Sequence, residues 1–297
     1  AKRREKVSLA GKTYDAVWLL AKYISLTLQD FENIQYLTFT TPETDVDMAK
    51  MLKGIGQHIG VDKEIINVQD YKESFCQYMI FQPKELWQYE SALFYCDEDR
   101  IKAYMLRRLR VDASHGMNSF VTVDEVANAQ RKELEALYPI MNKEKSPDES
   151  FKSMIENVFE KKVISSVYLT GEGFEKNWYP NSLRVLCNGR RAFMGNNLYS
   201  KGACYKSIRK CEPNDDGPIY LDETKLTERI CLRMRVDGQE GWYPLVTWGT
   251  HWYEADGQWE VLLEDASDIE ILVESLVDEE VQVEKVSLEG LPKRTDY

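Results

Sequence analysis

The stretch "SSVYLTGEGFEKNWYPNSL", from Ser165 to Leu183, decides how the fold of this chain is interpreted. An apolar strand runs into Gly171 and Gly173 and then into a proline-led segment that is typical of a helix start. Both glycines allow positive φ and close backbone approach, which a bound adenine needs and which a tight strand-to-helix corner also needs. Phe174 could stack on a base or seal the core. The pattern leaves a nucleotide loop and a structural corner open and favours the corner, because two glycines alone are weak evidence.

The sequence before this stretch is typical of an α/β region. Apolar residues recur at helical spacing over residues 14–28 and 48–59, and Thr44 is the expected cap of the second helix. Two capping signals, Thr122-x-x-Glu125 and Ser146-Pro147-x-Glu149, predict further helices. Before these two signals the sequence also predicts buried strands at 34–42 and 64–68, a helix at 71–81, and a strand hairpin from 92–96 to 100–109.

Beyond Cys211 the pattern changes. The segment "CEPNDDGP" is rich in turn formers, and short alternating strands follow it, with tight-turn signals at Asp237-Gly238 and Asp256-Gly257. We therefore predict an α/β domain over residues 1–212 and an all-β antiparallel sandwich over residues 213–297.

The densest aromatic cluster lies in the predicted sandwich, in "WYPLVTWGTHWYEADGQW". Alternation should place some of these rings in the core and leave others on a face suited to a protein or peptide partner. The candidate partner-binding residues are Trp242, Trp248, Trp252 and Tyr253.

Composition excludes several classes of function. The net charge of −12 argues against a surface for nucleic acid or an anionic membrane. The N-terminus has no hydrophobic signal core, no apolar stretch approaches the roughly 20 residues that span a bilayer, and the six cysteines lack C-x-x-C spacing, so we expect a cytoplasmic protein. The three histidines form no metal pattern and no serine lies in a G-x-S-x-G elbow, so neither a metal site nor a catalytic residue is predicted. Because the chain opens at Ala1, we expect a fragment or a processed chain.

The order of these segments resembles the later part of an actin-like ATPase module, as in the seventy-kilodalton heat-shock chaperones. The matching phrases are "YLTFTTP", "MAKMLKGIGQHIGV", "IINV", "YKESFCQYM", "LFYCDEDRIKAYML", the adenosine-loop phrase "VYLTGEGF" and "KGACY". The tail that ends in "LEGLP" is similar to the peptide-binding sandwich of the chaperones. The resemblance implies an incomplete actin-like, ribonuclease-H-like α/β module followed by a β-sandwich, and the whole chain resembles a bacterial family of unknown function.

Departures from the actin-like pattern bear on activity. The Asp-x-Gly hairpin that binds phosphate near the start of such modules has no counterpart here. The second phosphate loop is replaced by the turn from Tyr95 to Arg100, which holds three carboxylates and no glycine. Three carboxylates would repel a triphosphate. They could hold Mg²⁺, although a solvated surface turn is the commoner meaning.

Two functions follow from this pattern. The first is a non-catalytic, chaperone-like scaffold that binds a protein or peptide, with a degenerate nucleotide cleft and no cofactor. The alternative is an ATP-dependent, chaperone-like switch that binds ATP and Mg²⁺ and whose missing phosphate-binding lobe lies upstream or on another chain. In that alternative the nucleotide would contact Gly171, Gly173 and Phe174.

Overall fold

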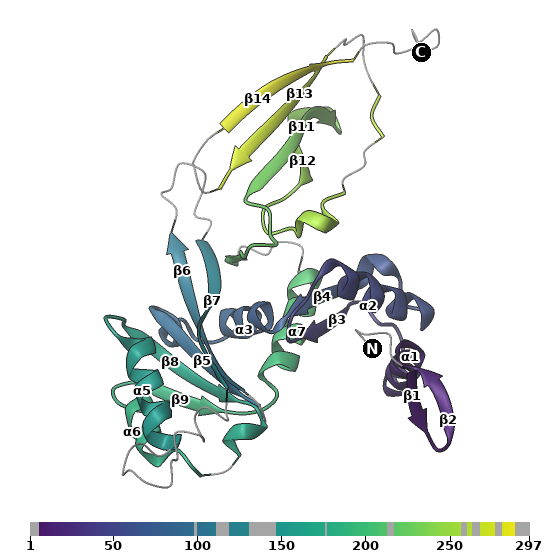
Figure 1. Ribbon diagram of the computed structural model, residues 1–297. Coiled ribbons are helices and arrows are strands. Elements are labelled where there is room, and N and C mark those ends of the chain that lie inside the picture. The colour runs from purple at the N-terminus through teal and green to yellow at the C-terminus, as the bar shows by residue number, and fades with distance from the viewer. Residues whose placement is uncertain are drawn as a thin grey trace, which may run out of the picture. The chain divides into compact units, whose positions relative to one another are not determined.

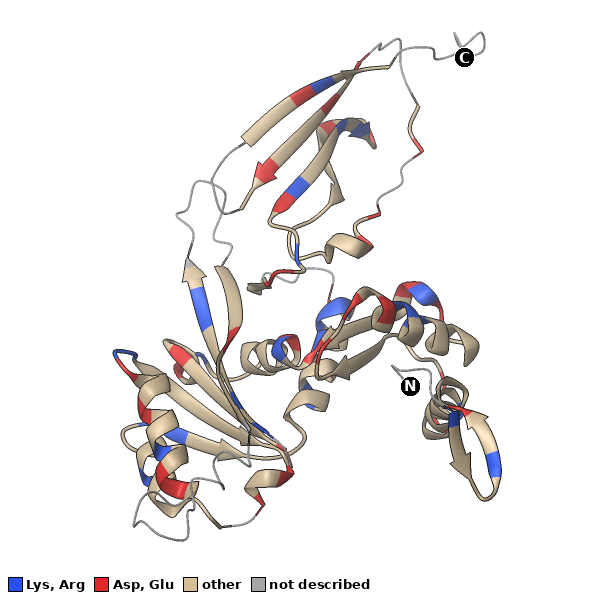
Figure 2. Ribbon diagram, in the orientation of Figure 1, with Lys and Arg blue, Asp and Glu red and all other residues tan. Residues whose placement is uncertain are grey.

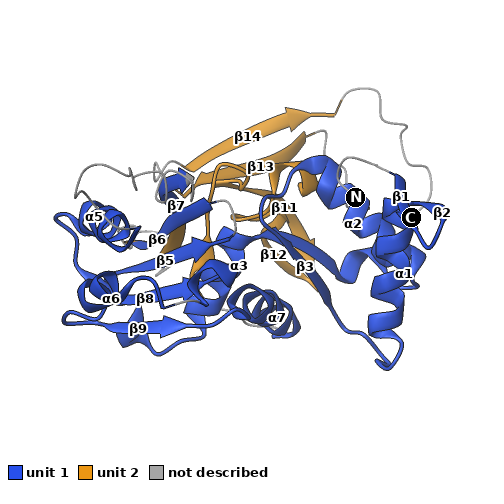
Figure 3. Cartoon of the chain, turned by 60° about the horizontal axis from the view of Figure 1, so that its bottom comes forward, with its two compact units in different colours: residues 1–108, 123–216 blue, residues 109–122, 217–297 orange. Residues whose placement is uncertain are grey.

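The computed structural model describes residues 6–97, 100–110, 119–130, 147–175, 177–212, 217–256, 260–262, 268–276 and 281–288. The chain divides into two compact units (Figure 3). The first unit contains residues 1–108 and 123–216, and the second contains residues 109–122 and 217–297. The predicted boundary between residues 212 and 213 stays a prediction, and the grouping of residues 109–122 with the second unit was not anticipated.

A six-stranded mixed sheet has the strand order β10-β7-β6-β5-β8-β9. Its strands are β5 (Glu90–Cys96), β6 (Arg100–Arg110), β7 (Ser119–Gln130), β8 (Ile164–Thr170), β9 (Arg191–Met194) and β10 (Ile219–Tyr220). Strand β5 pairs antiparallel with β6, while β8 runs parallel to both β5 and β9 (Figure 1). This arrangement confirms the mixed α/β class and the predicted hairpin of β5 and β6.

The helix predicted from the Thr122-x-x-Glu125 signal is wrong, because these residues lie in strand β7. Phe120, Val121 and Val123 of β7 are buried, so packing of the strand overrides the local capping pattern. The second capping signal is confirmed, since α5 (Pro147–Phe159) begins at its proline.

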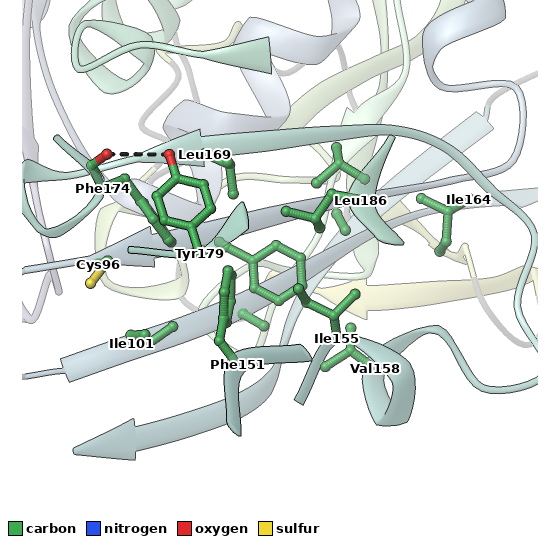
Figure 4. Packing of buried hydrophobic residues seen from close by; sticks show 14 of the residues in the cluster. Cys96, Ile101, Phe151, Ile155, Val158, Ile164, Leu169, Phe174, Tyr179 and Leu186 are labelled. Atoms are coloured by element: carbon green, nitrogen blue, oxygen red, sulfur yellow. Dashed lines mark hydrogen bonds between the residues drawn. The ribbon is translucent and has the colours of Figure 1, made fainter. Parts of the chain in front are cut away.

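Helices α5 and α6 (Pro180–Leu186) cover one face of this sheet, in the part that belongs to the first unit. Their contact with β5, β6 and β8 forms a large apolar cluster (Figure 4). Phe151 of α5 has no exposed surface and meets Phe94 of β5 edge to face, with ring centroids 5.4 Å apart. On the opposite face, Tyr168 of β8 contacts Phe75 of α3 (Tyr71–Ile80).

A second, two-stranded parallel sheet pairs β3 (Leu37–Thr41) with β4 (Ile66–Asp70). The first unit also contains the hairpin of β1 (Lys6–Leu9) and β2 (Lys12–Asp15) and the helices α1 (Ala16–Leu28), α2 (Val46–His58) and α7 (Leu198–Cys211). The N-cap of α2 is Asp45, whose carboxylate accepts a bond from the Met48 amide, so the predicted cap at Thr44 is displaced by one residue. None of the described helices is both long and apolar enough to cross a bilayer.

Helices α3 and α7 cross at Gly202, where an added Cβ would lie 1.9 Å from the carbonyl oxygen of Ser74. Beside this crossing, Lys206 donates to the buried carboxylate of Glu73 at 2.9 Å, and Arg209 donates to Gln77 at 2.9 Å. Gly202 permits the two helix backbones to touch, and the two polar pairs fix how α3 and α7 align along each other.

The second unit contains a four-stranded antiparallel sheet with the order β12-β11-β13-β14. Its strands are β11 (Glu228–Val236), β12 (Gln239–Val246), β13 (Asp268–Ser275) and β14 (Val281–Ser287). Asp237 and Gly238 both have positive φ in the tight turn between β11 and β12, as predicted. The turn signal at Asp256-Gly257 implied a strand before it, but this segment forms the short 3-10 helix η5 (Trp252–Glu254), and Gly257 lies outside the described residues. The described residues of this unit thus confirm an antiparallel sheet, and they also include β10 paired with the start of β7, while the predicted sandwich stays a prediction.

Candidate functional site

The predicted corner after β8 packs against the end of β5. Gly171 has φ 104° and ψ 151°, and its N–H donates to Asn196 Oδ1 at 3.0 Å. A Cβ on Gly171 would lie 2.1 Å from the Cys96 carbonyl oxygen, and one on Gly173 would lie 2.2 Å from the Cys96 sulfur. Close approach of the two strand ends therefore accounts for both glycines without a ligand.

Phe174, the third candidate nucleotide residue, is 2% exposed and belongs to the apolar cluster under α5. Tyr179 donates its hydroxyl to the Phe174 carbonyl at 3.2 Å, the bond drawn in Figure 4. The Trp178 indole donates to the Gly173 carbonyl at 2.8 Å. These contacts favour the structural role of all three candidates, and nucleotide binding at this corner stays a prediction.

In the acidic turn between β5 and β6, one carboxylate accepts a hydrogen bond from the backbone of the turn itself. Asp97 accepts the amide of Arg100 at 2.6 Å, and its own amide donates to the Arg100 carbonyl at 3.0 Å. Glu98 and Asp99 lie outside the described residues. No cluster of three or more metal-ligating side chains occurs in the described part of the chain.

A carboxylate that the sequence analysis did not single out holds the exit of the corner. Asp148, on α5, accepts the amides of Asn181 and Ser182 at 2.7 and 2.8 Å and the Ser182 hydroxyl at 2.7 Å. These amides are unsatisfied donors of the first turn of α6, so Asp148 caps that helix from a neighbouring one. Burial acts to raise the pKa of Asp148, but the bonds from Ser182 and Asn181 outweigh it and lower this pKa.

We expect Asp148→Asn to lose about 1–3 kcal/mol of unfolding free energy at pH 7, because an amide replaces a buried carboxylate that accepts three bonds. Since the folded pKa lies below the unfolded value, the wild-type carboxylate stabilises the fold above about pH 4, and this stability is lost as pH falls through the folded pKa. Urea unfolding at pH 7 and pH 3 measures both effects. The matched control is Glu156→Gln on the exposed side of α5, and an equal loss in both variants would contradict the capping role.

The four candidate partner-binding aromatics do not form one cluster. Trp252 is 57% exposed and Trp242 is 37% exposed, whereas Trp248 and Tyr253 are half-buried. Trp252 meets Tyr253 edge to face at 5.5 Å, and Tyr253 stacks on the buried His251 at 4.8 Å. Trp242 makes no ring contact with the described part of the chain.

Trp248 is held in place by contacts with residues of two neighbouring strands. The Arg229 guanidinium lies 4.4 Å from the centre of its ring, and its indole donates to the Glu274 carbonyl at 3.2 Å. Arg229 is also paired with the buried carboxylate of Glu274. Trp248 therefore anchors one end of the sheet, and the solvent-accessible aromatics are Trp242 and Trp252.

The two faces of the four-stranded sheet differ in chemistry. Residues opposite one another in an antiparallel ladder share a face. The observed register therefore assigns each paired side chain to one of the two faces. One face carries an ion-pair ladder in which Arg233 bonds Glu270 at 2.6 Å and Lys285 bonds Glu270 at 3.0 Å; charged residues are coloured in Figure 2. Trp242, opposite Arg233, lies on this face.

The other face is apolar. Its apolar members are Ile230, Leu232, Met234, Val236, Tyr243, Val246, Ile269, Ile271, Val273 and Val286, with Glu228 and Glu284 as charged exceptions. Among the apolar members only Leu232 is buried. The alternation in β11 already contains this signal, because apolar residues alternate with Arg233 and Arg235. No such ion-pair ladder or open face was inferred from the sequence.

The fold and these sites define a two-unit protein, with a mixed α/β unit and a separate antiparallel sheet. The chain belongs to the family of unknown function DUF5716, whose C-terminal model matches residues 1–223. Residues 225–297 match a domain of unknown function, DUF8552. No curated protein matches the chain. Among solved structures it is similar to ADP-bound MreB5 of Spiroplasma citri, with 10% identity and a TM-score of 0.39 over 70% of this chain and 80% of that one.

Proposed function

We propose that the chain is a non-catalytic scaffold that holds a protein partner on the apolar face of the sheet in its second unit. The observation that carries this proposal is the half-buried row of Met234, Ile269, Ile271 and Val273, none of which the described residues of this unit bury fully. A sheet ordinarily buries its apolar face against another layer. A partner that supplies this layer would complete the predicted sandwich.

The opposite face is a poor alternative for such a partner. Its charges neutralise one another through the contacts of Glu270 with Arg233 and Lys285, which leave little unpaired charge to recruit an ion. Exposed Trp252 is a residue type that contributes strongly to protein interfaces, whereas Trp242 lies on the charged face. The favoured partner therefore presents apolar side chains.

A photo-cross-linking amino acid at Ile271 tests the proposal in cells. We expect a discrete cross-linked protein from this position and none from position 235 on the charged face, which serves as the matched control. Met234→Glu on the same apolar face should abolish the product. Equal products from both positions, or products that persist with Met234→Glu, would overturn the proposal.

The finer identity of the first unit is also a proposal. We infer a degenerate actin-like module from the order of its elements, supported by the packing of Cys96 against both glycines of the corner. The chaperone-like role and the bacterial origin rest on the sequence resemblance. A cytoplasmic location is supported by the cysteines, all six of which lie in described residues and none of which forms a disulfide.

We expect the chain to bind Mg-ATP weakly or not at all. The space that an adenosine loop would leave beside Gly171 and Gly173 is filled by Cys96, and the turn at Asp97 adds negative charge where phosphates would lie. Calorimetric titration with Mg-ATP, with magnesium chloride alone as control, measures this. A micromolar dissociation constant would favour the ATP-dependent switch and its Mg²⁺ cofactor instead.

A further inference from the structure

Helix α1 is apolar on the side that it turns to solvent as well as on the side that it buries. Ala16 and Ala21 are buried, yet Trp18, Tyr23 and Leu26 are 50%, 67% and 53% exposed. The one charged residue between Ala16 and Leu28 is Lys22. A helix that is apolar all round ordinarily lies inside a protein, so the solvent side of α1 requires a covering surface.

The segments that flank α1 also expose large apolar side chains. Val7 and Leu9 of β1 are 41% and 58% exposed, and Phe31, just after α1, is 65% exposed. Figure 1 shows the β1 and β2 hairpin beside α1. We call this surface, Val7, Leu9, Trp18, Tyr23, Leu26 and Phe31, the α1 patch. Large continuous apolar surfaces on a protein mark interaction sites.

A groove of about 640 Å³ lies between α1 and α2, next to the α1 patch. Trp18 and Ala21 line it from α1, and Lys50, Met51, Gly54 and His58 line it from α2. A Cβ on Gly54 would meet nothing within 4 Å, whereas one on Gly56 would lie 2.5 Å from Ile66. Gly56 is therefore required by packing, but Gly54 weakens the helix and only deepens the groove. A group that approaches the α2 backbone closely would account for Gly54.

We propose that a second copy of this chain covers the α1 patch, so that the α1 helices of the two copies pack together and Trp18 of each enters the groove of the other. A twofold contact requires one surface to be complementary to itself, and this one contains both an apolar ridge and a groove. Asp47 also lines the groove, one turn before Lys50, so each copy can offer both charge signs to the other. This balance matters because the whole chain carries a net charge of −12 and two copies repel elsewhere.

The exposed area is of the right order. Aromatic side chains have about 150–250 Å² each, so half to two-thirds exposure of Trp18, Tyr23 and Phe31 supplies roughly 300–400 Å². That is about half of the ~800 Å² per partner in a stable interface, before Val7, Leu9 and Leu26 are added.

Sedimentation velocity on the full chain tests the proposal. We expect a wild-type dimer with a micromolar dissociation constant and at least a roughly tenfold weaker one for the double variant Tyr23→Glu, Leu26→Glu, because each copy then buries two charges. Gly54→Leu should weaken the dimer similarly by filling the groove. This second variant replaces a helix breaker by a helix former, so a folding defect cannot explain its effect.

Three outcomes would overturn the proposal. The matched controls, Val163→Glu and Met194→Glu, change side chains that are 64% and 67% exposed in the same unit but outside the α1 patch. Equal weakening by these controls, or a dimer that both the α1-patch double variant and the groove variant Gly54→Leu leave intact, would place self-association elsewhere, for example on the sheet of the second unit. A wild-type chain that stays monomeric at about 100 μM would leave a different protein as the occupant.

Discussion

Gly171→Ala is expected to lose about 3–5 kcal/mol of unfolding free energy, a large share of the stability of an ordinary domain. The backbone at Gly171, with φ 104° and ψ 151°, lies in a region that only glycine populates readily. In addition, the new Cβ would lie 2.1 Å from the Cys96 carbonyl oxygen and 2.8 Å from its carbon. Both clashes are with backbone, so β5 and β8 would have to separate. Urea denaturation followed by far-UV circular dichroism measures the loss.

Gly189→Ala is the matched control for this variant. Gly189 has φ 70°, but a Cβ there would meet nothing within 4 Å. Its substitution should therefore cost only the left-handed backbone penalty of about 1–2 kcal/mol. Equal costs for the two variants would mean that the approach of Cys96 to Gly171 contributes nothing.

Gly202→Ala is expected to lose more than about 3 kcal/mol, because the methyl group would lie 1.9 Å from the Ser74 carbonyl oxygen at the crossing of α3 and α7. Relief requires the helices to move apart, which would also strain the pair of Glu73 and Lys206. Thermal and urea unfolding of the full chain measure this loss.

The same substitution at Gly54, in the interior of α2, should have the opposite sign. An added Cβ there enters open space, so Gly54→Ala should stabilise the fold by about 0.5–1 kcal/mol through helix propensity. If both variants were destabilised alike, the loss at Gly202 could not be assigned to the helix crossing.

Local patterns predicted those parts of the fold that local interactions determine. The proline start of α5, the hairpin of β5 and β6 and the Asp237-Gly238 turn each depend on residues close together in the chain. The Thr122-x-x-Glu125 signal failed because β7 is stabilised by its neighbours in the sheet. The strand predicted around Trp252 is wrong because the backbone there bonds to the distant segment 224–226, where Trp252 donates its amide to the Thr224 carbonyl and Thr250 accepts the Leu226 amide.

The candidate site was predictable only in outline. Two glycines after a strand indicated close backbone approach, but the sequence could not say that Cys96, rather than a ligand, makes that approach. Asp148 gave no signal at all, since it caps a helix that begins more than thirty residues later. The aromatic cluster indicated a surface, yet the separation of exposed Trp252 from anchored Trp248 depends on the pairing of the strands.

The second unit is discontinuous in sequence, and this constrains how the protein is made. Phe120 belongs to the early segment 109–122, yet its buried neighbours are Leu221 and Leu276. On the ribosome, Phe120 therefore emerges long before the residues that cover it, while strands β5 and β6 can already pair. Contacts between residues so far apart form late because loop closure precedes them. We infer that a nascent chain keeps this strand end uncovered until synthesis is almost complete, a stage at which chaperones would have most to protect.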